Sequence, residues 1–277
     1  MKRILVAIDM TDGSGNALGR ALRLAQTTGA SLRVLHAVPS PAFDMEPSAV
    51  RRLVCKAVAE MVEALPAPHP DVTIRISSLH KAEAILNSAQ RFGADLIVLG
   101  GHAEPRFRDA IFGTTATHVV RHAVCPVLVA QSDPTKPYHT AMLALSGVEE
   151  GKALHGVTDV LAPGAALTGV NAFDPSMGKL FGRRVALEKE ARDHAKALGT
   201  ALPGVKPLVE TGDPLTVLMD QARELDPDLV VMGTSQRAYL NSYAVDALFW
   251  CERDLLIVPS PRRPVAAAPG LGGAVFA

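Results

Sequence analysis

The chain carries the same series of segments twice, and this internal repeat is the feature that most limits its fold. "TAMLALSG" from Thr140 is similar to "RILVAIDM" from Arg3, "DPDLVVMGTS" from Asp226 to "GADLIVLGGH" from Gly93, and "DLLIVPS" from Asp254 to "CPVLVAQ" from Cys125. The spacings of these pairs are 137, 133 and 129 residues. Three matches at a nearly constant spacing favour an internal duplication. The second copy is shorter between its last two matched segments.

Within each copy, apolar runs rich in Val, Ile and Leu alternate with amphipathic helical patterns, which is typical of βαβ units around a buried parallel sheet. In the first copy, the predicted strands cover Arg3–Asp9, Ser31–Val38, Val72–Ser77, Asp95–Gly100 and Val127–Ala130. The predicted helices cover about Ser14–Thr28, Ser48–Leu65, Ala82–Phe92 and Thr114–His122. The predicted fold class is α/β, with two doubly wound domains in tandem.

The expected domains are residues 1–132 and residues 139–260. Between them lies "QSDPTKPYH", whose two prolines suit a linker. The tail, residues 261–277, is rich in Pro, Ala and Gly, and we expect it to be flexible.

Charge and composition narrow the partners. Lys plus Arg and Asp plus Glu are equal at 28 each, so no global field favours nucleic acid or an anionic membrane. The three cysteines form no CxxC pair, which argues against a disulfide framework or a structural zinc site. Asp9 interrupts the apolar start, and no apolar run approaches the roughly 20 residues of a membrane span. The expected location is the cytoplasm.

The loop "GGHAEPRFRDAIFGTT" follows a predicted strand and precedes a predicted helix. Ligands of open parallel sheets bind beyond the carboxyl ends of the strands. Gly113, Thr114 and Thr115 suit a helix N-terminus that offers N–H groups and the positive dipole end to phosphate. Arg106 and Arg108 are within the same loop. The same residues also suit an ordinary turn and helix cap, so both interpretations stay open.

This loop resembles the signature of the universal stress protein family, which is glycine, two residues, glycine, nine residues, glycine, then serine or threonine. Gly100 and Gly113–Thr114 occupy the outer positions, and Ala103 stands at the middle glycine. "RILVAIDMTDGS" is similar to the family's first strand and "VVRHAVCPVLVA" to its closing helix and strand. Both halves match, so the chain resembles a tandem universal stress protein.

The resemblance implies two flavodoxin-like, Rossmann-like repeats, each with a five-stranded parallel sheet of order 3-2-1-4-5. Family members pair through their fifth strands, so a tandem chain is expected to form an internal pseudo-dimer, and a homodimer remains open. It also implies a stress-response protein that binds ATP or another adenine nucleotide in the first repeat, with or without Mg²⁺. The nucleotide site carried over comprises Asp9, Val38, Leu99, Gly100, Ala103, Gly113, Thr114 and Thr115.

Two features support a rival interpretation, an interaction or regulatory module without nucleotide. If the position of Ala103 needs a left-handed backbone, alanine costs about 1 to 2 kcal/mol there, and Glu104 would repel an anion. In the second copy, Ser146 replaces Asp9, and the corresponding loop has no inner glycine, with Ser242 aligned to Gly113. We therefore expect that copy to be degenerate. No general base or arginine finger is recognisable, so at most slow ATP hydrolysis is expected, with no catalytic residue assigned.

His118 and His122 have a spacing that can chelate zinc, but no third ligand is evident, and cationic side chains also suit a helix C-terminus. No metal site is predicted. Tyr239, Tyr243, Phe249 and Trp250 concentrate aromatic side chains near the end of the second copy, where a core or an inter-repeat contact is the expected use, with an unknown protein partner as the alternative.

Overall fold

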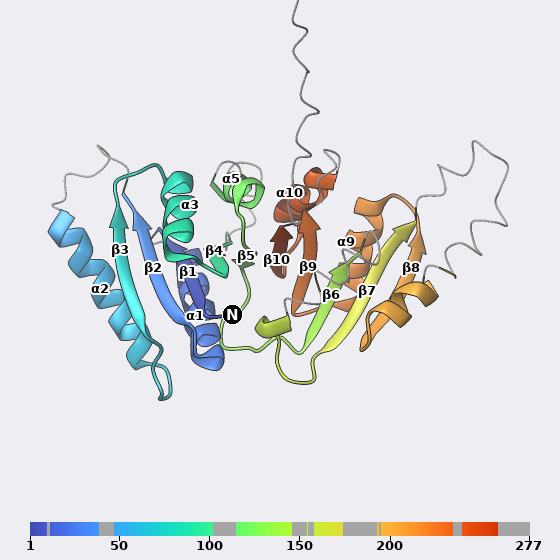
Figure 1. Ribbon diagram of the computed structural model, residues 1–277, viewed down its shortest axis with the longest axis horizontal. Helices are drawn as coiled ribbons and strands as arrows, with labels where there is room; N and C mark the ends of the chain where they lie inside the picture. Colours follow the sequence, from blue (N-terminus) through green and yellow to red (C-terminus); the bar gives the residue numbers. More distant parts are fainter. Residues whose placement is uncertain are drawn as a thin grey trace, which may run out of the picture.

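The protein, described here from a computed structural model, forms one ten-stranded sheet with helices packed on it (Figure 1). The structure describes residues 1–9, 12–38, 47–101, 115–145, 154, 158–173, 193, 195–234 and 240–259. The strand order is β3-β2-β1-β4-β5-β10-β9-β6-β7-β8. Strands within each half pair in parallel, and β5 pairs with β10 in the antiparallel sense. The α/β class and the tandem organisation are confirmed.

Repeat 1 is the half that contains β1 to β5. Its strands are β1 (Arg3–Ile8), β2 (Ser31–Ala37), β3 (Val72–Ser77), β4 (Leu96–Gly100) and β5 (Val127–Ala130), and its helices are α1 (Asp12–Thr28), α2 (Pro47–Glu63), α3 (Lys81–Phe92) and α5 (Thr115–His122). β3 and β5 have the predicted bounds. β1 and β2 each end one residue early, so Asp9 and Val38 follow their strands instead of closing them.

Repeat 2 contains β6 to β10. Counted from the outer edge of the sheet, its strand order is β8-β7-β6-β9-β10, which corresponds to β3-β2-β1-β4-β5 in repeat 1. Its elements are β6 (Thr140–Ala144), a 3-10 turn at Thr158–Val160, β7 (Ala166–Phe173), β8 (Val205–Thr211), α9 (Pro214–Leu225), β9 (Leu229–Thr234), α10 (Leu240–Trp250) and β10 (Asp254–Pro259). α9 and β9 are the counterparts of α3 and β4.

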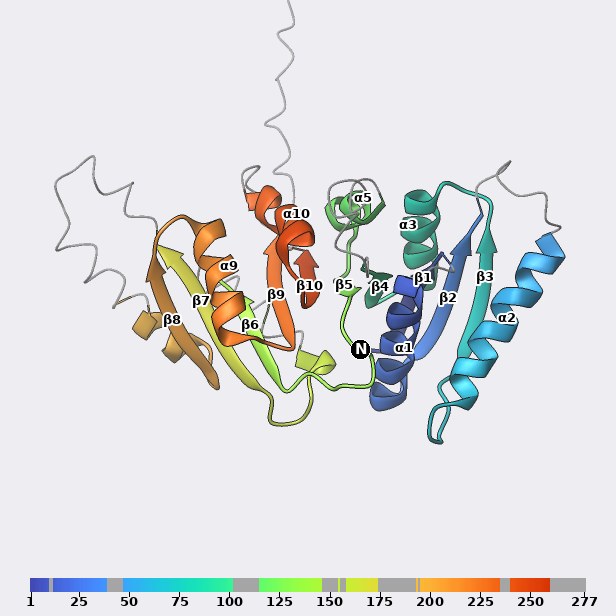
Figure 2. The ribbon, with the colours of Figure 1, turned by 180° about the vertical axis from the view of Figure 1, so that it is seen from behind.

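The sheet is buried on both faces, which explains the continuous apolar strands. In β1, Ile4, Val6 and Ile8 contribute to a core shared with α1, whereas Leu5 contributes to a second core that includes residues of α3. Because successive strand residues point to opposite faces, a strand covered on both sides must be apolar at nearly every position. α1 and α3 both contact β1 and β2 and belong to different cores, so each covers its own face of the sheet (Figure 2).

Equivalent hydrogen bonds recur in the two repeats. Asp95 Oδ2 accepts from two N–H groups at the start of β1, at 2.7 and 3.0 Å, and Asp228 Oδ2 accepts from N–H groups of His139 and Thr140 at 2.8 and 2.9 Å. Each carboxylate therefore ties the segment before the fourth strand of its repeat to the first strand. The duplication extends to individual contacts as well as to the order of elements.

The repeats join through their fifth strands. Val127 pairs with Ile257, and Leu128 pairs with Leu256. By the sequence repeat, Ile257 is the counterpart of Leu128 and Leu256 that of Val127. Each strand therefore uses the same surface toward the other, which is the pattern of a two-fold contact. The chain forms within itself the contact that the resemblance implies for separate subunits.

Among the helices that the structure describes, none combines the length and the apolar character needed to cross a membrane. Cys55, Cys125 and Cys251, all within the described ranges, are free thiols. Burial raises the pKa of Cys251 to about 12 and, with the charge of Asp95, the pKa of Cys125 to about 11.

Candidate functional site

The carboxyl ends of β1, β2 and β4 meet at one edge of repeat 1. Ile8 pairs with His36 across β1 and β2, and Ala7 pairs with Leu99 across β1 and β4. The residues that follow these strands therefore leave the sheet at the same level. This register brings together the predicted site residues Asp9, Val38, Leu99 and Gly100. Thr115 begins α5, and Ala103, Gly113 and Thr114 lie outside the described residues.

Asp9 is exposed and is held by Ser14 of α1. Ser14 Oγ donates to Asp9 Oδ1 at 2.6 Å and accepts from the Asp9 N–H at 2.8 Å. Bonds to a charged carboxylate are short and roughly twice as strong as neutral ones. This reciprocal pair fixes the acid at the sheet edge, and it also joins the strand end to the start of the helix.

Gly100 is needed because of a close approach, and its backbone is not left-handed. A Cβ on Gly100 would lie 2.6 Å from the Gly13 carbonyl oxygen and 3.3 Å from the Ser14 nitrogen. Since both neighbours are backbone atoms, neither can rotate away. The absence of a side chain at Gly100 thus lets the N-terminus of α1 rest against the end of β4.

Val38 and Leu99 can contribute to a ligand site only through limited groups. The Val38 N–H already donates to the Ser77 carbonyl at 2.8 Å. The Leu99 side chain is 5% exposed and belongs to the core on the side of α3. A contact from Leu99 to a ligand at the edge would therefore involve its backbone.

His36 adds a hydrogen bond beneath this edge. Its Nδ1 lies 2.9 Å from the Ile8 carbonyl oxygen, which requires a proton on that nitrogen. Asn171 makes the equivalent bond in repeat 2, where its Nδ2 donates to the Leu145 carbonyl at 2.7 Å. Repeat 2 keeps this bond although it has Ser146 in place of the carboxylate of Asp9, so the bond of His36 is best explained as support for the strand end.

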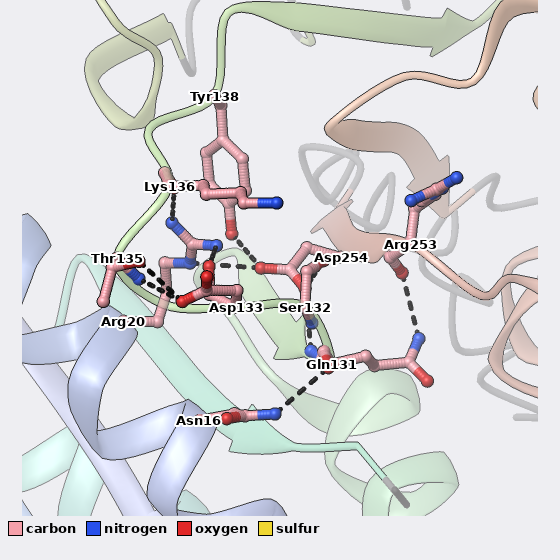
Figure 3. Close-up of polar contacts among 10 residues, drawn as sticks. All are labelled: Asn16, Arg20, Gln131, Ser132, Asp133, Thr135, Lys136, Tyr138, Arg253 and Asp254. Atoms are coloured by element: carbon pink, nitrogen blue, oxygen red, sulfur yellow. Dashed lines mark hydrogen bonds and ion pairs between the residues drawn. The ribbon is translucent and has the colours of Figure 1, made fainter.

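Gln131, just after β5, connects the edge to repeat 2 (Figure 3). Its side-chain amide donates to the carbonyl oxygens of Cys251 and Arg253, at 3.0 and 2.9 Å. Asn16 of α1 donates to the Gln131 carbonyl oxygen at 3.1 Å. Gln131 thus links the end of β5 to α1 and to the turn between α10 and β10.

Asp254 is the centre of a buried polar cluster at the same junction, and its exposed fraction is 0%. Oδ1 accepts from the N–H groups of Gln131 and Ser132, both at 2.7 Å, and from Ser132 Oγ at 2.6 Å. Oδ2 accepts from Arg20 Nε at 3.1 Å and from the Tyr138 hydroxyl. Five donors compensate for the loss of hydration of this carboxylate.

Arg20 completes this cluster, which we call the junction lock: Arg20, Ser132, Tyr138 and Asp254. Arg20 is 1% exposed and donates to the linker carbonyls of Lys136 and Asp133, at 2.5 and 2.9 Å. Its guanidinium carbon lies 4.2 Å from the centre of the Tyr138 ring. Burial and then the charge of Asp254 raise the pKa of Tyr138 well above its usual value, so its hydroxyl stays protonated and donates.

Sequence reasoning did not identify the junction lock or Ser14. One signal was available in α1, because Arg20 stands among Ala17, Ala21 and Leu24, on a helix face that is otherwise apolar. Another was Asp254, an acid at the start of an apolar strand where the first copy has Cys125. Nothing local in the sequence indicates that these two charges meet.

In repeat 2 the corresponding edge has different residues. Ser146 and Gly151 stand where repeat 1 has Asp9 and Ser14. Both lie outside the described residues, as do residues 235–239 after β9. The sequence of repeat 2 therefore cannot supply the pair of carboxylate and hydroxyl that repeat 1 places at its edge.

The remaining candidate residues have structural contacts. His122 Nδ1 lies 2.8 Å from the His118 carbonyl oxygen, and the two rings stack with their centres 4.2 Å apart. Among the described residues, no cluster of His, Cys, Asp or Glu could hold a metal ion. Tyr243 and Trp250 pack against the core on the side of α5 and α10, where the helices of the two repeats meet. Tyr239 lies outside the described residues.

Comparison with known proteins agrees with this architecture. The universal stress protein family model matches residues 1–131 and 145–245. A universal stress protein of Thermus aquaticus is 34% identical over 137 residues, which cover 47% of this chain and 98% of that protein. Universal stress protein E of Escherichia coli K12 is 24% identical over 300 residues, covering 93% of each chain.

The fold of the whole chain also has a solved counterpart. The structure of a universal stress protein from Archaeoglobus fulgidus DSM 4304 aligns with a TM-score of 0.68 and 15% identity, and covers 93% of this chain and 98% of that one. At this identity the likeness concerns the fold. Because the family model matches most of both repeats, the chain belongs to the universal stress protein family, as a member with two repeats in tandem.

Proposed function

We propose that repeat 1 binds an adenine nucleotide, with ATP as the first choice, at the carboxyl ends of β1, β2 and β4. Occupancy of this site would be the signal of a protein whose family acts in the stress response. The observation that carries the proposal is the Asp9–Ser14 pair, which presents a carboxylate at this edge beside the contact between Gly100 and α1.

Each group at the edge suits one part of such a ligand. Asp9 is suited to accept hydrogen bonds from ribose hydroxyls. Because the Val38 N–H is engaged, its contact to the base would use the carbonyl oxygen. That acceptor suits the 6-amino group of adenine and opposes the O6 acceptor of guanine.

The phosphates would lie at the start of α5, with Gly113, Thr114 and Thr115. A helix N-terminus offers N–H groups and a positive dipole end to an anion. The first turn of α5 contains no acidic residue that would oppose this charge. Magnesium would arrive with the phosphates, since the described residues contain no cluster that could hold a metal alone.

Other members of the family have been solved with adenine nucleotides, one in complex with cAMP and one from Archaeoglobus fulgidus in complex with dAMP. Those ligands belong to those proteins. The case for this chain rests on its own residues, and the same residues give no base for a fast hydrolytic reaction.

A second function is favoured by a specific observation. The contact between Gly100 and Gly13 explains the first glycine of the loop by packing alone, and Ala103 replaces the middle glycine. On this view the chain is an interaction module without nucleotide. Mass spectrometry of gently purified protein distinguishes the two functions, because adenine nucleotide that co-purifies would contradict the second.

Calorimetric titration with ATP and magnesium tests the first function. The wild type is expected to bind one nucleotide per chain, and Gly113→Asp to bind none, because its carboxylate would repel the phosphates. Ser242→Asp is the matched control, since it adds the same charge at the aligned position of repeat 2 and should leave binding unchanged. Equal heat for the wild type and Gly113→Asp, or no heat for either, would refute the site.

A further inference from the structure

Gln131 lies between the first residues of the candidate phosphate loop and repeat 2. Gly101, directly after β4, is buried, and its N–H donates to the Ala130 carbonyl at 2.8 Å. A Cβ on Gly101 would lie 2.2 Å from Gln131 Cγ, so the stem of Gln131 rests against the Gly101 backbone. The far end of the same side chain donates to the carbonyls of Cys251 and Arg253.

The backbone of Gln131 is fixed from two sides as well. Its N–H donates to Asp254 Oδ1 at 2.7 Å, and its carbonyl accepts from Asn16 at 3.1 Å. Asn16 is two residues along α1 from Ser14, which holds Asp9. Gln131 is therefore anchored both to repeat 2 and to the helix that begins at the candidate site.

We propose that Gln131 is a positioning residue for the phosphate end of the nucleotide, through which repeat 2 sets the geometry of the site in repeat 1. The inference rests on the proposed nucleotide site. Functional groups hold their geometry only when the residues behind them are fixed by packing and hydrogen bonds. Gln131 gives Gly101 such a support, and that support comes from the other repeat.

Only repeat 1 has the residues to receive this support. By the sequence repeat, the counterparts of Gly101 and Gln131 are Thr234 and Ser260. Threonine has the side chain that Gly101 lacks, and serine is too short to repeat the reach of glutamine. Repeat 2 thus supports the site of repeat 1 without receiving the same support, which gives a repeat with a degenerate site a reason to be retained.

A consequence is thermodynamic coupling. Suppose that the bonds from Gln131 to the turn at Cys251–Arg253 favour ATP binding. ATP must then stabilise this turn by the same factor by which the bonds increase the affinity for ATP. Coupling between sites is typically 5- to 150-fold, and we expect about fivefold from this one residue.

The first arm of the test measures ATP affinity by calorimetry. Gln131→Met keeps a stem of similar length against Gly101 and removes both side-chain donations, whereas Gln131→Ala also removes most of the stem. We expect ATP to bind about fivefold more weakly to Gln131→Met, and more weakly still to Gln131→Ala. Lys136→Ala is the matched control, because this exposed linker residue contributes only its carbonyl to the junction lock. Urea unfolding is measured for each variant, and affinities are compared only at conditions under which every variant is folded.

The second arm measures the reverse effect. Cys251 is 4% exposed and its carbonyl accepts from Gln131, so its alkylation by N-ethylmaleimide requires local opening of the turn. Saturating ATP should slow alkylation of Cys251 about fivefold in the wild type and not in Gln131→Met. Cys55 of α2, followed in the same peptide digest, should be unaffected.

The outcomes separate the two proposals. The positioning role is overturned if both Gln131 variants bind ATP with the affinity of the wild type. It is also overturned if ATP does not change the rate at which Cys251 of the wild type is alkylated. Either result leaves the nucleotide site intact. Absence of ATP binding to the wild type overturns the proposed function and this inference with it.

Discussion

At the scale of single residues, two glycines of the loop have packing partners that explain why they lack side chains. Gly100 admits the backbone of Gly13, and Gly101 admits the stem of Gln131. A glycine selected for close packing and one selected for phosphate binding look the same in a sequence. The glycine pattern therefore indicated this edge of the sheet as a candidate site, while the packing reason for Gly100 and Gly101 required the structure.

Gly100→Ala is expected to destabilise the protein by about 1–3 kcal/mol, the usual cost of forcing extra atoms into a packed region. The added methyl group would meet the Gly13 carbonyl, a backbone group that cannot rotate away. Gly15→Ala is the control. Gly15 lies on an exposed turn of α1, and a Cβ added there would meet nothing within 4 Å. The free energy of unfolding in urea distinguishes them. A Gly100→Ala protein as stable as the wild type would show that α1 does not press on β4.

At the scale of helices and strands, the sequence predicts most of repeat 1. Apolar strands buried on both faces follow from local physics. A helix end at glycine does too, because glycine adopts the left-handed conformation readily, as Gly29 and Gly93 do after α1 and α3. The ends of β1 and β2 were predicted one residue late, because β1 ends at Ile8 and β2 at Ala37. The Asp9 N–H donates to Ser14 Oγ of α1 instead of to a neighbouring strand, and the Val38 N–H makes one last bond to the Ser77 carbonyl just beyond the strand end. The pairing of β5 with β10 was predicted only through the family resemblance, because the apolar pattern of a strand does not specify its neighbour, and its antiparallel sense was visible only in the structure.

The residue that ends α9 has an uncommon backbone conformation. Asp226 has a φ of 44°, in the left-handed region, at the position where repeat 1 has Gly93 with a φ of 62°. Asp226→Gly should stabilise the protein by about 0.5–1 kcal/mol, because relief of the backbone exceeds the added freedom of the unfolded chain. The exposed ion pair of Asp226 with Arg253 contributes little.

Asp226→Ala provides the comparison, since it removes the same ion pair and keeps the Cβ. Urea unfolding should rank the glycine variant above the wild type and the alanine variant below it. An alanine variant as stable as the glycine variant would show that the left-handed turn carries no strain.

At the scale of the whole molecule, the junction lock breaks the two-fold likeness of the repeats. Asp254 stands where repeat 1 has Cys125, and its partner Arg20 lies 234 residues away in the sequence. Local patterns cannot reveal such a pair, because the two charges are adjacent only after both repeats have folded and joined. The sequence thus predicted two domains and a linker, while the chemistry that fixes the linker was visible only in the structure.

Asp254→Asn should cost about 3–5 kcal/mol of stability, because it leaves the Arg20 guanidinium buried without its counter-charge. Arg20→Met should be similarly costly. The double variant should lose much less than the two losses together, since a neutral pair no longer buries an uncompensated charge. A double-mutant cycle on urea unfolding measures this coupling. Strictly additive losses would mean that Arg20 and Asp254 stabilise the chain independently.

The most direct test of the nucleotide site is a crystal structure of the whole chain grown with ATP and magnesium. We expect one nucleotide per chain at the carboxyl ends of β1, β2 and β4, with the ribose at Asp9 and the base at Val38. We expect none at the ends of β6, β7 and β9. A crystal grown at saturating ATP that holds no nucleotide at the ends of β1, β2 and β4 would contradict the proposed site. Nucleotide at the ends of β6, β7 and β9 would contradict it as well.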